Sequence, residues 1–173
     1  MKTITPDKID ENGIAHFIDK SSPFAEGKPV VQRNVVHVIV INRKTNEVLG
    51  LFWPKENWRA LVVGGIENGQ DHFQAAEAEV REETGYTNIR FLAELARTST
   101  LFYAGHKQVN RQADAIGLLY ELVDDTRVEV SAEELLQQTP VWIPLAEMSE
   151  WLNLDNQSYN WNKALEFLQI ENA

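Results

Sequence analysis

The stretch GGIENGQDHFQAAEAEVREETGY, residues 64–86, constrains the fold more than any other part of this 173-residue chain. Its helical pattern begins after Asp71, a good N-cap residue, and stops before Gly85, which suits the position just past a helix C-terminus. Apolar residues recur there at spacings of three and four, which predicts one buried stripe: Phe73, Ala76 and Val80. We therefore expect a helix that is anchored on a core.

Three glutamates lie in the second half of this helix, and their spacings of three and four put Glu79, Glu82 and Glu83 on one face. Like charges at this spacing repel, so a fold gains nothing from them unless a cation lies between them. Carboxylates suit Mg²⁺ or Mn²⁺, and a turn at Gly64-Gly65 would add the bare carbonyl of Gly64 as a further oxygen ligand. A solvated face of an acidic helix explains the same spacing, so spacing alone leaves both interpretations open.

The composition favours one soluble domain. Hydrophobic residues make up 43% of the chain, which is enough for a full core. The absence of cysteine excludes disulfides, thiol catalysis and Cys-ligated zinc, and it suits a reducing cytosol. The formal charge of −10 argues against broad binding to nucleic acids or anionic membranes. The N-terminus lacks the apolar run of a signal peptide, so we expect a cytoplasmic protein with no membrane contact.

The rest of the chain reads as a mixed α/β domain over residues 30–173, preceded by a short N-terminal extension, 1–29, with room for a hairpin. A sheet with helices on its faces fits the order of elements. We expect strand, turn and strand over 29–53, with the turn in NRKTNE, then strands over 58–66, 88–104 and 111–123, a short helix or turn over 131–139, a strand over 140–148 and a helix over 156–170 that carries Trp161, Leu165 and Leu168 on one face.

The opening stretch resembles the Nudix box, G-x5-E-x7-R-E-U-x-E-E-x-G-U, in which U is a bulky aliphatic residue. The matching positions are Gly64, Glu79, Val80, Glu82, Glu83 and Gly85, with Tyr86 in the final bulky place. Two positions depart from the box: Gln70 replaces its first glutamate, and Ala78 replaces its arginine. In the family that arginine orients a glutamate, so its loss bears on Glu82; Arg81 points elsewhere and is a poor replacement.

The resemblance implies a Nudix-type mixed sheet between helices and a Mg²⁺-dependent hydrolase that cleaves a nucleoside diphosphate linked to another group. Glu79, Glu82, Glu83 and Gly64 would hold the metal. The general base in such enzymes is a box glutamate or a glutamate of a later loop, here Glu133 or Glu134. An acidic first turn that suits the helix dipole is the simpler explanation of this later pair.

Other residues are candidates for contacts with a small phosphorylated, nucleotide-derived substrate. Trp53 and Trp58 would stack on a planar group, or fill the core and cover an edge. Cationic or titratable side chains would hold phosphate oxygens, or belong to solvated segments: Lys55, Arg59, His106, Lys107 and Arg111, the last three on an expected loop. We interpret His37 as a satisfied strand histidine, and Trp142, Trp151 and Trp161 as core residues or part of a homodimer surface.

The segments GGIENGQ and FYAGHKQVNRQA are also similar to Nudix domains found inside some bacterial leucyl-tRNA synthetases, over roughly residues 28–152. Two alternatives to an active hydrolase therefore stay open. One is a weakened Nudix-fold module that binds a nucleotide-like ligand. The departures from the box at Gln70 and Ala78 favour this alternative. The other is a partner of the translation apparatus.

Overall fold

The computed structural model describes residues 2–171, apart from the side chains of His106, Ile170 and Glu171. The elements in chain order are β1 (Lys8–Ile9), β2 (Ala15–Ile18), β3 (Val30–Asn42), β4 (Glu47–Trp53), β5 (Trp58–Ala60), β6 (Val62–Gly65), α1 (His72–Thr84), β7 (Ile89–Ala104), the 3-10 helix η1 (Gly105–Lys107), β8 (Val109–Leu122), α2 (Ala132–Gln137), β9 (Thr139–Pro144), α3 (Met148–Trp151) and α4 (Asp155–Glu171). No helix in this described part is long and apolar enough to cross a membrane.

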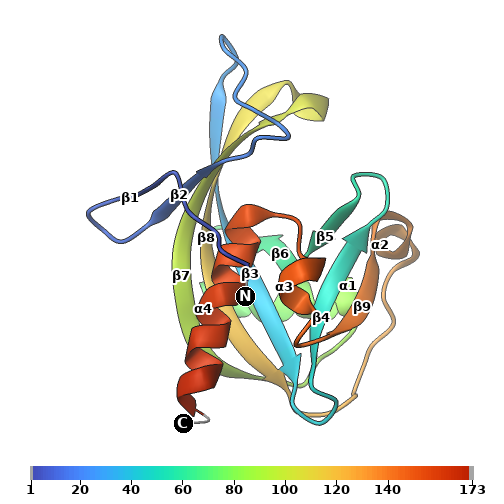
Figure 1. Cartoon of the computed structure of the whole chain (residues 1–173). Coiled ribbons are helices and arrows are strands. Elements are labelled where there is room, and N and C mark those ends of the chain that lie inside the picture. Colours follow the sequence, from blue (N-terminus) through green and yellow to red (C-terminus); the bar gives the residue numbers. More distant parts are fainter. Residues whose placement is uncertain (1, 172–173) are drawn as a thin grey trace.

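Within the described residues the strands form one nine-stranded mixed sheet. Its main path is β1-β2-β7-β8-β3-β4-β5, while β6 pairs with β3 and β9 pairs with β4. The parallel pairing of β3 with β8 is long and runs from Val30 opposite Asn110 to Ile41 opposite Glu121. Figure 1 shows β7, β8 and the beginning of β3 extending together beyond the helices.

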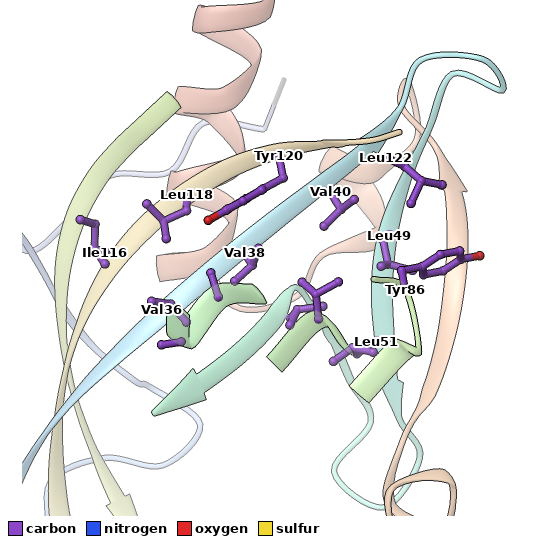
Figure 2. Packing of buried hydrophobic residues seen from close by; sticks show 14 residues of the cluster. Val36, Val38, Val40, Leu49, Leu51, Tyr86, Ile116, Leu118, Tyr120 and Leu122 are labelled. Atoms are coloured by element: carbon purple, nitrogen blue, oxygen red, sulfur yellow. The ribbon is translucent and has the colours of Figure 1, made fainter. Parts of the chain in front are cut away.

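Two hydrophobic clusters cover the two faces of this sheet, because side chains alternate between faces along each strand. On one face Val36, Val38 and Val40 of β3 pack with Ala76 and Val80 of α1; Figure 2 shows the strand residues of this cluster. On the other face Ile39 and Ile41 pack with Trp161, Ala164 and Leu168 of α4. The prediction of a mixed sheet between helices is confirmed.

Helix α1 has the ends that its sequence predicts. Asp71 is its N-cap and accepts a hydrogen bond from the backbone N–H of Gln74 at 2.8 Å. Gly85 ends the helix at φ 82°, a left-handed conformation that glycine adopts without strain. Ala76 and Val80 are fully buried, and Phe73 packs against the same cluster. The predicted buried stripe is confirmed.

The N-terminal residues form the expected hairpin, since β1 pairs antiparallel with β2. Strand β2 then pairs in parallel with β7, so the hairpin extends the main sheet. Ala15 and Phe17 of β2 are buried, and the Phe17 ring contacts Tyr159 of α4 edge-on. The boundary at residue 29 stays a prediction.

Two local predictions were wrong. The single strand expected over 58–66 is divided at Leu61 into β5 and β6, which pair with β4 and β3 respectively. Gly64 and Gly65 lie inside β6, opposite Val36 and Val35, and do not form a turn. The chain turns only after them, where Gln70 N–H donates to the Glu67 carbonyl at 3.0 Å. The dipeptide is therefore needed for close approach rather than for turning, as the site shows.

Candidate active site

The three box glutamates act on one another electrostatically, as expected of one helix face, but they differ in environment, and the expectation that this face is separate from the buried stripe was wrong. Glu83 is only 7% exposed and shares the buried side of the helix with Val80. Glu79 is half-buried, and Glu82 is exposed. The group therefore runs from the core to the surface. Among the described residues, no three acidic or histidine side chains converge as a preformed ligand set.

Burial makes both inner carboxylates costly to ionise. It raises the pKa of Glu83 to about 9, and the neighbouring charges of Glu79 and Glu134 add to the effect. Burial likewise raises the pKa of Glu79 to about 7, with Glu82 and then Glu134 adding to it, while Arg33 opposes it. The backbone N–H of Val63 donates to Glu83. Two such carboxylates gain stability from any cation that enters between them.

The residues present fit a divalent cation. One oxygen of Glu83, Oε2, is buried and has no hydrogen-bond partner among the described residues. An unpartnered buried carboxylate oxygen is expensive unless a ligand completes it. Carboxylates and a backbone carbonyl are the hard oxygen donors that Mg²⁺ prefers. The box offers such carboxylates in Glu79, Glu82 and Glu83, and the Gly64 carbonyl as a further donor stays a prediction.

The two glycines of β6 make room for two opposite charges. A β-carbon on Gly64 would overlap the carboxylate end of Glu79. A β-carbon on Gly65 would overlap the guanidinium of Arg33. Successive residues of a strand face opposite sides of the sheet. The end of β6 therefore has a carboxylate packed on one face and a guanidinium on the other.

Helix α2 brings a further acid to this site. Ser131 caps α2 by accepting a hydrogen bond from the backbone N–H of Glu134 at 3.2 Å. The charge of Glu134 raises the pKa of both Glu79 and Glu83, whereas Glu133 is not among the causes of either shift. Of the two later glutamates, the structure therefore brings Glu134 to the box.

A pocket of about 370 Å³ adjoins the box. Gly64 and Glu79 line it, together with Trp53 and Trp58. The two tryptophans are cross-strand partners at the end of the β4–β5 pair, so they stand beside each other at the pocket wall. Trp58 is 39% exposed, while Trp53 also packs against the core cluster of α1.

The predicted cationic residues separate into two groups. Arg111 lines the pocket, but it lies in β8 and not on the expected loop. Lys55, Arg59 and Lys107 do not line it: Lys55 and Lys107 are exposed, and the half-buried Arg59 has an Nε without a partner among the described residues. The side chain of His106 lies outside the described part of the chain.

His37 is buried in β3, and the amide of Asn160 donates to its Nδ1 at 3.1 Å, which places the ring proton on Nε2. Burial lowers the pKa of His37 to about 4, so the ring is neutral near pH 7. The interpretation as a satisfied strand histidine is confirmed, although the ring also lines the pocket.

The remaining tryptophans belong to the fold. Trp161 is fully buried and donates from Nε1 to Ser149 at 3.0 Å. Trp142 donates from Nε1 to the Tyr86 hydroxyl at 2.8 Å and packs against the core. Trp151 is half-buried in the cluster on the α4 face.

The two departures from the box have structural consequences. Gln70 accepts a hydrogen bond from the Glu67 backbone N–H at 3.1 Å, so its side chain closes the turn after β6. Ala78 leaves Glu82, one helical turn later, without a cationic partner among the described residues. Arg81 is exposed on α1 and makes no ion pair with Glu82.

Sequence reasoning missed Arg33. It lines the pocket from β3, beside Gly65 and near Glu79. The available signal was its place in QRNVVHVIVI, where a long charged side chain stands just before the β-branched run of a buried strand. Arg33 is exposed and belongs to the end of β3 that precedes the buried run.

Residues 31–165 match the family model of the NUDIX domain. The chain belongs to the Nudix family. Its fold is similar to that of a C. elegans Ap4A hydrolase in a binary complex, with a TM-score of 0.59, 18% sequence identity, and coverage of 79% of this chain and 98% of the other. A comparison with curated protein sequences found no match.

Two further Nudix folds are similar in the same way. One is described as a mutator MutT protein from Bacillus halodurans, with a TM-score of 0.54, 18% identity and coverage of 77% of this chain and 82% of the other. The other is the E. coli dihydroneopterin triphosphate pyrophosphohydrolase, with a TM-score of 0.53, 15% identity and coverage of 76% and 95%. At such identities the likeness shows the fold alone.

Proposed function

We propose that this Nudix protein is a Mg²⁺-dependent hydrolase that cleaves the pyrophosphate bond of a nucleoside diphosphate linked to another group. The observation that carries the proposal is the buried Glu83 and the half-buried Glu79, which lies against Gly64, at the edge of a pocket walled by Trp53 and Trp58. Acidic ligands next to an aromatic pocket suit a metal-bound phosphate attached to a planar base.

Each side chain has a distinct part in this proposal. Glu79, Glu82, Glu83 and the Gly64 carbonyl hold the cation; Mn²⁺ suits the same ligands. The bound cation neutralises the pyrophosphate and makes hydroxide available near neutral pH. Trp53 and Trp58 orient the nucleoside by stacking, and Arg111 donates to phosphate oxygens.

The reaction requires a base as well as a positioned water. Water adds to one phosphorus, the bond from that phosphorus to the bridging oxygen breaks, and the second phosphate leaves. Glu134 accepts the proton of the water, because it is the acid outside the box whose charge acts on both Glu79 and Glu83. Glu133 lies on the same turn of α2 and provides the matched control.

The test is a hydrolysis assay over a panel of nucleotides with Mg²⁺, with Mn²⁺ and with EDTA, in which the products are separated and quantified. We expect metal-dependent turnover of at least one nucleoside diphosphate derivative. Glu134→Gln should lower kcat at least a hundredfold, as loss of a general base does. Glu133→Gln should stay close to wild type. If the two substitutions changed kcat equally, Glu134 would not be the general base.

A second candidate is a Nudix module that binds a nucleotide-like ligand without turnover. It is favoured by the engagement of Gln70 in a turn and by the lack of a cationic partner for Glu82. Tight binding of a nucleotide by calorimetry, together with no product in the metal panel, would decide for it. The link to the translation apparatus and the homodimer stay predictions of the sequence.

A further inference from the structure

Two arginines line the pocket from neighbouring strands. Arg33 lies in β3 and Arg111 in β8, and both contribute to the pocket wall. In the parallel register Arg111 is opposite Val31, two residues before Arg33. This register places the two on one face of the sheet, with Cα atoms roughly 8 Å apart from the strand spacing and the rise per residue. Ala113, opposite Arg33, leaves the space beside it open.

Neither guanidinium is neutralised by an ion pair with an acid of the described residues. Arg111 Nε is also buried without a hydrogen-bond partner in that part of the chain. Arg33 is exposed, so solvent screens its charge, but keeping the buried Arg111 donor unpaired is costly. This cost is unexpected in a chain with 26 acidic and only 16 basic residues, in which acids are plentiful.

The acidic residues that line the pocket make other contacts and do not pair with the two arginines. Asp19 accepts hydrogen bonds through Oδ1 from the backbone N–H of Ser21 at 2.8 Å and from its hydroxyl at 2.6 Å. Glu79 is packed against Gly64, whereas Arg33 lies over Gly65 on the opposite face of β6. Arg33 affects the pKa of Glu79 only as one of its weaker causes, and the two side chains form no ion pair.

We infer that Arg33 and Arg111 form an anion subsite for phosphate oxygens of the substrate beyond the bond that is cleaved. Guanidinium groups bind phosphate with paired, charge-assisted hydrogen bonds, and two adjacent guanidiniums match a polyphosphate better than a single phosphate. The inference rests on the proposed function and specifies its substrate class. The group linked to the nucleoside diphosphate is itself anionic, as in a nucleoside triphosphate or a dinucleoside polyphosphate, and not a neutral sugar.

Binding of inorganic tripolyphosphate, measured by calorimetry in EDTA, tests the subsite without turnover and without metal. The wild type should bind it, and Arg33→Gln and Arg111→Gln should each weaken Kd roughly tenfold to hundredfold, as loss of a charged hydrogen bond does. The exposed arginine of β7 gives the control, because Arg97→Gln should leave Kd unchanged. A melting curve checks each variant; if one fails to fold, the other carries the comparison.

Hydrolysis then tests the substrate class. The kcat/KM of wild type should be higher for ATP or diadenosine tetraphosphate than for ADP-glucose. Arg33→Gln and Arg111→Gln should each lower kcat/KM for the anionic substrates, relative to that for ADP-glucose, at least tenfold. Separate rates on ATP and on diadenosine tetraphosphate show which of the two anionic substrates is preferred. Equal tripolyphosphate binding by wild type and both variants would overturn the subsite, as would preference for ADP-glucose. Arginine-dependent binding without any turnover would retain the subsite and reject the hydrolase.

Discussion

Glu79 lies against Gly64 so closely that residue 64 has no room for a β-carbon. The three nearest atoms that a β-carbon would meet belong to the flexible carboxylate end of Glu79 and not to backbone. Gly64→Ala should therefore leave the fold intact and displace Glu79. We expect the melting temperature to stay near that of wild type while kcat falls about a hundredfold, as displacements near 1 Å at a reacting site do.

Gly65→Ala and Gly50→Ala serve as matched controls for this prediction. In Gly65→Ala the added methyl group displaces Arg33 instead of Glu79, so we expect a larger effect on KM than on kcat. The second presses on the ring of Trp151 and on Ile143 inside the fold, so it should lower the melting temperature. If Gly64→Ala behaves like Gly50→Ala, its contact with Glu79 is structural and not catalytic.

The two pocket tryptophans should respond differently to truncation. Trp58 is 39% exposed, so Trp58→Ala should keep its stability and raise KM by the 1–3 kcal/mol, about five- to 150-fold, that a stacked base contributes. Trp53 also packs against the core, so Trp53→Ala should in addition lose part of the roughly 3–5 kcal/mol of a core tryptophan. Unchanged kinetics and stability in both variants would exclude either role.

Restoring the box arginine tests the consequence of Ala78. The side chain at position 78 is partly exposed and lies one helical turn before Glu82, which is exposed. Ala78→Arg should pair with Glu82 at little cost in stability, since such pairs contribute about 0.3–0.5 kcal/mol. We expect tighter Mg²⁺ binding or higher kcat. A folded variant with equal or lower activity would mean that the site is built around alanine.

The buried histidine predicts a pH dependence of stability. Burial lowers the folded pKa of His37 to about 4 from 6.5, so in that window the unfolded chain binds more protons than the folded one. The contribution of His37 is thus fully present above pH 6.5 and is lost as pH falls towards 4. Urea unfolding across this range should show a shallower loss for His37→Gln than for wild type; parallel curves would contradict it.

The sequence predicted the fold well because its signals are local. The caps Asp71 and Gly85 fix the ends of α1, and the β-branched run in β3 predicts a buried strand. The helix face of Glu79, Glu82 and Glu83 was only partly predictable. Spacing places residues around a helix, but it does not tell how far the sheet covers each one, and the sheet buries Glu83 while leaving Glu82 in solvent.

Long-range pairing explains the other differences. Arg111 and Arg33 are far apart in sequence, and only the parallel register of β3 with β8 brings them to one pocket. Glu134 reaches the box because α2 packs beside α1, and nothing local distinguishes it from Glu133. Gly64-Gly65 resembled a turn, since glycine pairs usually mark one; here the pair accommodates side chains from α1 and β3.

The central claim is that Glu79 and Glu83 hold a divalent cation, and melting curves with and without Mg²⁺ test it most directly. A ligand that binds only the folded state raises the melting temperature, so Mg²⁺ should stabilise wild type. Without metal, Glu79→Gln and Glu83→Gln should be at least as stable as wild type, because burial makes each carboxylate costly to ionise and a neutral amide carries no such cost. Their Mg²⁺ shift should shrink, while Glu77→Gln, on the exposed side of α1, should keep it in full. Equal Mg²⁺ shifts in all four proteins would contradict the account.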